Sequence, residues 1–78
     1  MPIVTVQVTR EGNKPGLDRV TPEQKADVIR GISQVLLDVL GKPLDRTHVL
    51  LEEIELENWG QGGLPLGEYR KQQAGRNG

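Results

Sequence analysis

Pro2, directly after Met1, is the residue whose type and place point most clearly to chemistry. Methionine is usually removed before a small residue, and Pro2 would then carry a free secondary amine. Such an amine is more basic than an ordinary α-amino group, whose pKa is about 7.7–8.0. Burial and nearby cations both disfavour its protonated form and would bring its pKa towards neutrality. Pro2 is therefore a candidate general base, although most prolines in this position have no catalytic part.

Two segments predict the strands that would position this amine. Residues 2–9 alternate three valines with polar side chains, and β-branched residues dominate the run. Residues 47–54, Thr-His-Val-Leu-Leu-Glu-Glu-Ile, are predicted to form the second strand. The amine of Pro2 would thus lie at the start of a strand.

A helix is predicted between the two strands, over residues 22–40. Thr21 is a good N-cap, and Gln24, three residues later, completes a capping box. Gly41 is expected to end the helix. Gly31, in the middle of the helix, predicts a close approach to a sheet or a neighbouring helix. The apolar stripe of this helix consists of Val28, Ile29, Ile32, Val35, Leu36, Val39 and Leu40.

Strand, helix and strand in this order predict a β-α-β unit of the α/β (α+β) class, with parallel strands and a right-handed connection. The Gly-rich segment 58–67 around Trp59 predicts a short hairpin. We expect one domain over residues 2–70, followed by a polar, frayed end over 71–78.

The size of the chain predicts self-association. A chain of 78 residues buries only ~60% of the surface that its unfolded form exposes, and this one has no phenylalanine and a single tryptophan. An isolated two-stranded sheet is also marginal. Edge-to-edge pairing with a second copy would give a four-stranded sheet, and stacking the open faces would close the core. We therefore expect a symmetric homo-oligomer.

Composition excludes several classes of function. A net charge of -1 argues against a general nucleic-acid binder. The absence of cysteine excludes disulfides and thiolate metal sites, and one histidine leaves little for a histidine-rich metal site. No apolar run approaches the ~20 residues that span a bilayer, and no secretory signal is visible. A cytoplasmic protein is the expectation.

Five segments carry a resemblance to a known family. They are Pro2-Ile3-Val4, Thr21-Pro22-Glu23-Gln24-Lys25, Gly41-Lys42-Pro43-Leu44, Glu53, and Trp59-Gly60-Gln61-Gly62-Gly63. In order and spacing they resemble the 4-oxalocrotonate tautomerase family over about residues 2–67.

The resemblance implies a β-α-β protomer that assembles as a homohexamer, a trimer of dimers. It also implies keto-enol tautomerisation of 2-oxo acids or 2-hydroxydienoates, with Pro2 as the proton-shuttling base and with no metal or organic cofactor. The partners implied are a small carboxylate substrate and further copies of the chain, with neither nucleic acid nor membrane.

Two arginines compete for the family's carboxylate-binding position, which lies just before the first helix. Arg10 ends the first strand, and Arg19 precedes the helix cap. Arg10 is roughly 26 Å from Pro2 along an extended strand at ~3.3 Å per residue, so it would serve Pro2 of a neighbouring subunit. We favour Arg10, because a strand holds it more rigidly than a loop holds Arg19.

Two further residues are candidates for the substrate site. His48 stands where the best-known members carry a second arginine, and a neutral imidazole lacks the fixed charge and the fork of a guanidinium. An ordinary strand histidine is an equal alternative. Trp59 matches the family's aromatic at the mouth of the site, where an apolar wall would help to keep the proline amine neutral. It could equally anchor the hairpin.

Other activities stay open at this point. The superfamily also contains hydratases, dehalogenases and decarboxylases, in which protonated proline acts as an acid and another residue activates water. Here Glu53 or the acidic run 52–57 would have to serve. A non-catalytic oligomer that binds carboxylates is a third possibility, which retention of Met1 would favour.

Overall fold

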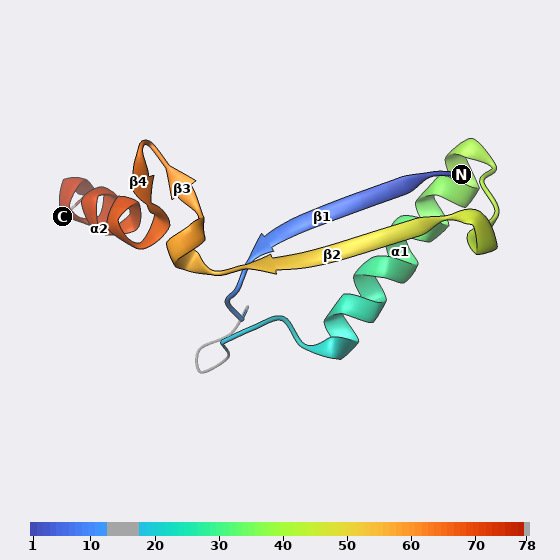
Figure 1. Cartoon of the computed structure of the whole chain (residues 1–78), viewed down its shortest axis with the longest axis horizontal. Helices are drawn as coiled ribbons and strands as arrows, with labels where there is room; N and C mark the ends of the chain where they lie inside the picture. The colour runs from blue at the N-terminus through green and yellow to red at the C-terminus, as the bar shows by residue number, and fades with distance from the viewer. Residues whose placement is uncertain (13–17, 78) are drawn as a thin grey trace.

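The computed structural model describes residues 1–12 and 18–77, and Figure 1 shows its elements. Two strands and a long helix form the main unit, and a small hairpin and a second helix follow it. In chain order the elements are β1 (Ile3–Thr9), α1 (Pro22–Leu40), the 3-10 turn η1 (Leu44–Arg46), β2 (His48–Ile54), the 3-10 turn η2 (Leu56–Asn58), β3 (Gly60–Gln61), β4 (Leu64–Pro65) and α2 (Leu66–Asn77).

The predicted β-α-β arrangement is confirmed. Strands β1 and β2 are parallel, with Ile3 opposite His48 and Thr9 opposite Ile54. Both strands therefore start at one end of the sheet, the start end, and finish at the other, the far end. The backbone N–H of Arg10 extends the pairing by donating to the carbonyl of Ile54 at 2.8 Å.

Helix α1 begins and ends where its sequence signals predict. The Thr21 hydroxyl accepts from the backbone N–H of Gln24, and the Gln24 side chain accepts from the backbone N–H of Thr21, so the capping box is complete. Gly41 closes the helix in the left-handed conformation, with φ of 68°, which glycine adopts without strain.

The two faces of the β1–β2 sheet differ in exposure. The half-buried face, which α1 covers in Figure 1, carries Val4, Val6, Val8, Val49 and Leu51. The other face, here called the open face, carries Ile3, Thr5, Gln7, His48, Leu50 and Glu52. Ile3 is 68% exposed and Leu50 is 52% exposed, so large apolar side chains on the open face remain in contact with water.

The hairpin and α2 lie beyond the far end of the sheet (Figure 1). Strands β3 and β4 pair antiparallel, as the sequence predicts, and the two residues between them, Gly62 and Gly63, both have positive φ. A side chain at Gly62 would also come within 3.2 Å of the Tyr69 ring. Helix α2 was not predicted, and it includes residues 71–77, which were expected to be part of a frayed end.

A single chain contains almost no core. Among the described residues only Leu66 is buried. The radius of gyration is 16.3 Å, whereas a compact domain of this length has a radius of ~11.5 Å. The expected close neighbour of Gly31 is absent within the described part of the chain, because a Cβ added there would meet nothing within 4 Å. The chain is extended because its apolar faces have no partner within the same copy.

Candidate functional site

Pro2 lies in a small pocket at the start end of the sheet. The backbone N–H of His48 donates to the Pro2 carbonyl at 3.0 Å, which fixes Pro2 against the first residue of β2. The pocket has a volume of about 340 Å³ and is lined by Met1, Pro2, Lys42, Pro43, Asp45 and Arg46. This volume is at the lower end of the ~300–1,000 Å³ typical of small-molecule sites, so the pocket suits a small ligand.

The segment between α1 and β2 supplies the other side of this pocket. The backbone N–H of Lys42 donates to the Leu36 carbonyl at 3.2 Å. The Pro43 carbonyl accepts from the Arg46 backbone N–H at 3.1 Å and from the Thr47 hydroxyl at 2.9 Å. These bonds fix the backbone on both sides of η1, and they therefore fix the Cα positions of the residues that line the pocket.

Lys42 and Arg46 are functional candidates that the sequence reasoning missed. Both residues line the pocket of Pro2, in which Asp45 is the single acidic lining residue. The signal was present in the sequence: in a parallel β-α-β unit the residues before β2 lie beside those before β1. Cations placed there disfavour protonation of a nearby amine.

His48 shares the start end of the sheet with Pro2 but not the same face. Its imidazole is exposed and lies on the open face with Ile3, its partner in the register. Within one chain, therefore, His48 contacts Pro2 through its backbone.

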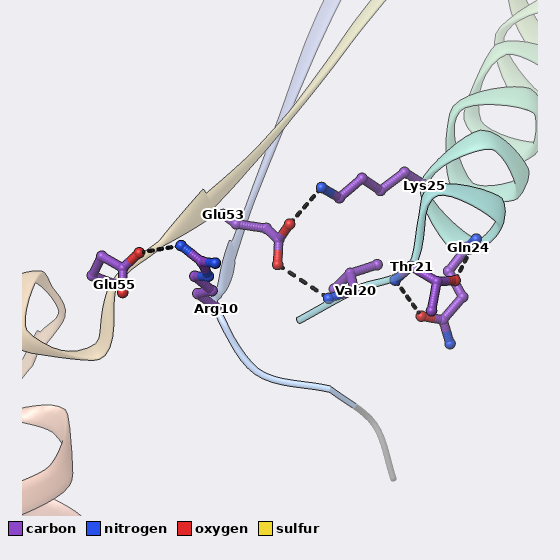
Figure 2. A network of polar contacts seen from close by, with 7 residues as sticks. All are labelled: Arg10, Val20, Thr21, Gln24, Lys25, Glu53 and Glu55. Atoms are coloured by element: carbon purple, nitrogen blue, oxygen red, sulfur yellow. Dashed lines mark hydrogen bonds and ion pairs between the residues drawn. The ribbon is translucent and has the colours of Figure 1, made fainter. Parts of the chain in front are cut away.

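Arg10 lies at the far end of the sheet and is already paired. Its guanidinium donates to the Glu55 carboxylate at 2.8 Å, as Figure 2 shows. The hydrogen bond that Arg10 donates to Glu55, and the negative charge of Glu55, raise the pKa of Arg10 above its ordinary value. Arg10 lines a second pocket with Asp18, Glu55 and Glu57, so three acidic side chains surround one arginine there. A substrate carboxylate would have to compete with them.

Glu53 joins the far end of β2 to the start of α1. Its carboxylate accepts from the Lys25 ammonium at 2.5 Å and from the Val20 backbone N–H at 3.1 Å (Figure 2). The hydrogen bond from Lys25, and then that from Val20, lower the pKa of Glu53. A carboxylate with a lowered pKa and two donors is a weak base, so Glu53 is poorly placed to activate water.

A second ion pair ties α2 to the chain after β1. Arg70 donates to both oxygens of Glu11, at 2.9 and 3.0 Å. Thr9 also donates to Glu11. The hydrogen bond from Arg70 comes first among the causes that lower the pKa of Glu11 to about 2. Like Glu53, Glu11 has a structural role.

Arg19 and Trp59 complete the set of predicted site residues. Arg19 is exposed just before Val20, and within residues 1–12 and 18–77 no carboxylate lies within 4.0 Å of its guanidinium. Trp59 is half-buried after η2, and its carbonyl accepts from the Leu66 N–H at 2.8 Å. The structure thus divides the predicted site: Pro2 and His48 lie at the start end of the sheet, whereas Arg10, Arg19 and Trp59 lie towards the far end.

Within residues 1–12 and 18–77, no group of three or more histidine and carboxylate side chains could hold a metal ion. No described helix is long and apolar enough to cross a membrane.

Comparison with known proteins gives one consistent result. The family described as tautomerase enzyme matches residues 2–69. The probable tautomerase K2 of Dickeya dadantii strain 3937 is 42% identical over 72 residues, which are 92% of this chain and 97% of that protein. A 2-hydroxymuconate tautomerase of Pseudomonas sp. strain CF600 is 37% identical over 51 residues, covering 65% of this chain and 81% of its own.

A solved structure extends the likeness to the fold. TomN, described as a 4-oxalocrotonate tautomerase homologue in the tomaymycin biosynthetic pathway, matches with a TM-score of 0.73 at 26% identity. The match covers 90% of this chain and 95% of that one.

Proposed function

Since this chain belongs to the tautomerase family, within the 4-oxalocrotonate tautomerase group, and is therefore an isomerase, we propose that it interconverts the keto and enol forms of small 2-oxo acids, with Pro2 as the general base. Substrates of the 2-hydroxydienoate type fit this proposal, because a relative 37% identical to this chain is named for 2-hydroxymuconate. The observation that carries it is the placement of Pro2 in a small pocket beside two cations.

The proposed reaction needs a free Pro2 amine. While Met1 is attached, the Pro2 nitrogen is part of an amide and has no basic lone pair. After removal of Met1, Lys42 and Arg46 favour the neutral amine, because they disfavour a third positive charge in the pocket. The amine then takes a proton from the hydroxyl of the dienol, or from the carbon next to the 2-keto group, and returns a proton to carbon at another position.

The complete site is proposed to form between copies. The candidate residues of one chain lie at two ends of the sheet, and antiparallel pairing of two β1 strands would bring the far end of one copy to the start end of the other. Arg10 or Arg19 of one copy would then reach Pro2 of its partner. Because Arg10 already forms an ion pair with Glu55, Arg19 is an equal candidate for binding the substrate carboxylate.

His48 and Trp59 have secondary parts in this proposal. His48 can donate one hydrogen bond to substrate from the open face. Trp59 is half-buried in its own chain, and from a neighbouring copy it would form an apolar wall beside the amine. Such a wall lowers the local dielectric and disfavours the protonated amine.

The surface of the chain supports association into a homo-oligomer, which we propose to be a hexamer built as a trimer of dimers. Its accessible surface is 5940 Å², whereas a folded monomer of 8.6 kDa exposes ~4,700 Å². The open face carries Ile3 and Leu50, and the outer side of α1 carries Val35 and Val39, which are 57% and 74% exposed. Stacking of these surfaces would remove them from water.

Ketonisation of enolphenylpyruvate tests the function. Protein that begins at Pro2, verified by mass spectrometry, is compared with a form that retains a blocked Met1. We expect the blocked form to lose at least about 100-fold in kcat/KM, the low end of the contribution of a general base. Equal rates would exclude Pro2 as the base.

A further inference from the structure

The proposed function leaves one position unassigned: the group of the same chain that faces the substrate carboxylate beside Pro2. We propose that Arg46, assisted by Lys42, binds a substrate carboxylate in the pocket of Pro2 within one chain. This inference rests on the proposed function only in taking the natural ligand to be the 2-oxo acid on which Pro2 acts.

The geometry of the pocket supports this assignment. All its lining residues come from two short segments, the first two residues of the chain and the turn between α1 and β2. Lys42 and Arg46 stand at the two ends of that turn, with Pro43 and Asp45 between them. A guanidinium offers a planar fork that matches a carboxylate, and an ammonium offers a second point charge.

The charges of this turn have no partner within the described chain. Within residues 1–12 and 18–77, no carboxylate oxygen lies within 4.0 Å of the Lys42 ammonium or the Arg46 guanidinium, although Asp45 lines the same pocket. Arg10, Arg30 and Arg70 each form an ion pair by the same criterion. A carboxylate ligand would therefore displace no described ion pair at Arg46, whereas at Arg10 it would displace Glu55.

A purely structural role explains only part of the arrangement. Lys42 directly follows Gly41, and a cation there interacts favourably with the negative end of α1. That role does not require Arg46, which belongs to the separate turn η1 and lines the pocket of Pro2. A structural role predicts an effect on Tm, whereas carboxylate binding predicts an effect on KM and on the Pro2 amine.

The test uses Arg46→Gln, Lys42→Gln and the double variant, all in processed protein beginning at Pro2. The matched control is Arg30→Gln, which removes an exposed arginine of α1 that pairs with Asp27. Three quantities are measured for each: KM and kcat for enolphenylpyruvate, the pKa of the Pro2 amine by 15N NMR, and binding of phenylacetate, an unreactive carboxylate. Tm is recorded to detect loss of structure.

We expect Arg46→Gln to raise KM by about tenfold or more while kcat stays within about threefold, because binding of the substrate carboxylate is shared by ground state and transition state. The double variant should show the larger increase. Both should weaken phenylacetate binding and raise the pKa of the Pro2 amine, because a cation near the amine is lost. Arg30→Gln should leave all three quantities unchanged.

The outcomes separate this inference from the proposed function. If the wild type ketonises enolphenylpyruvate and the Arg46 and Lys42 variants match Arg30→Gln in KM, phenylacetate binding and amine pKa, the inference is wrong and the function stands. A second outcome is that the wild type does not turn over enolphenylpyruvate, whereas the variants bind phenylacetate more weakly and have a raised pKa of the Pro2 amine. The carboxylate site is then supported and the proposed function is wrong. A change in Tm alone would also overturn the inference, because it indicates a structural role.

Discussion

The two ends of the β1–β2 sheet differ in how their charged side chains are paired. At the far end Arg10 bonds to Glu55, and Lys25 bonds to Glu53 (Figure 2). At the start end no described carboxylate lies within 4.0 Å of Arg46.

This difference separates charges that hold the fold from charges that can bind a ligand. The far-end pairs join segments that are distant in sequence, such as α1 and β2 through Glu53. The start-end cations instead line a pocket that also contains Pro2. Four predictions test the contrast, starting with the largest expected effect.

Leu50→Lys should disrupt the stacking of copies through which the hexamer is proposed to form. Leu50 is 52% exposed on the open face, where stacking of copies would bury it. A buried, unpaired ammonium is strongly unfavourable, so we expect dissociation to smaller species and loss of nearly all tautomerase activity. Sedimentation velocity at micromolar concentration measures the first effect. Gln34→Lys, on the polar side of α1, is the control, and an intact, active Leu50→Lys oligomer would contradict the proposed stacking.

Alanine substitution of the two far-end arginines should identify the one that serves the partner's Pro2. Loss of the arginine that binds the substrate carboxylate is expected to reduce kcat/KM by about 100-fold, or about 2.7 kcal/mol of transition-state binding. We compare Arg10→Ala with Arg19→Ala on a 2-oxo acid. Glu55→Ala is the added variant, because it frees Arg10 from its pair. If Arg19→Ala alone shows the loss, Arg10 is structural and our preference from the sequence is wrong.

Gly31→Ala tests whether another copy approaches the helix that runs along the sheet. The added Cβ meets no atom of the chain within 4 Å, and Ala is better than Gly inside a helix by about 1 kcal/mol. We expect a rise in Tm of about 4–8 °C for a domain of this size. A fall in Tm together with weaker association would contradict this expectation and would show that a second copy packs against Gly31.

Arg70→Gln should have the smallest effect and a defined pH dependence. The Glu11 carboxyl has its pKa lowered from 4.5 to about 2 by Arg70 and Thr9. The ion pair therefore stabilises the fold above pH 4.5 and loses that effect as the pH falls towards 2. Because the pair is partly exposed, we expect the Tm of Arg70→Gln to be about 1–3 °C below that of the wild type at pH 7. The difference should vanish near pH 2, and a difference independent of pH would contradict the assignment.

The sequence predicts the main elements because their signals are local. The capping box at Thr21 and the glycine at Gly41 mark both ends of α1. Alternating valines mark β1, and the Gly-rich segment marks the β3–β4 hairpin. Helix α2 was missed because its residues are mostly polar and show little amphipathic periodicity, although glutamine, lysine and arginine are good helix formers.

The candidate site was less predictable because it depends on contacts between distant segments. Pro2 stands out by type and position alone. Arg46 is 44 positions from Pro2 in the sequence and joins its pocket only through the register that pairs Ile3 with His48. The pairing of Arg10 with Glu55 likewise depends on where β2 ends.

The most direct test of the central claim is a comparison of two pKa values. In processed protein with 15N-labelled proline, NMR titration gives the pKa of the Pro2 amine, and the pH dependence of kcat/KM for enolphenylpyruvate gives that of the catalytic base in the free enzyme. We predict that the two agree, and that both rise together in Arg46→Gln. A Pro2 amine that titrates well away from the kinetic pKa, or a pH profile that survives blocking of the amine, would contradict the account.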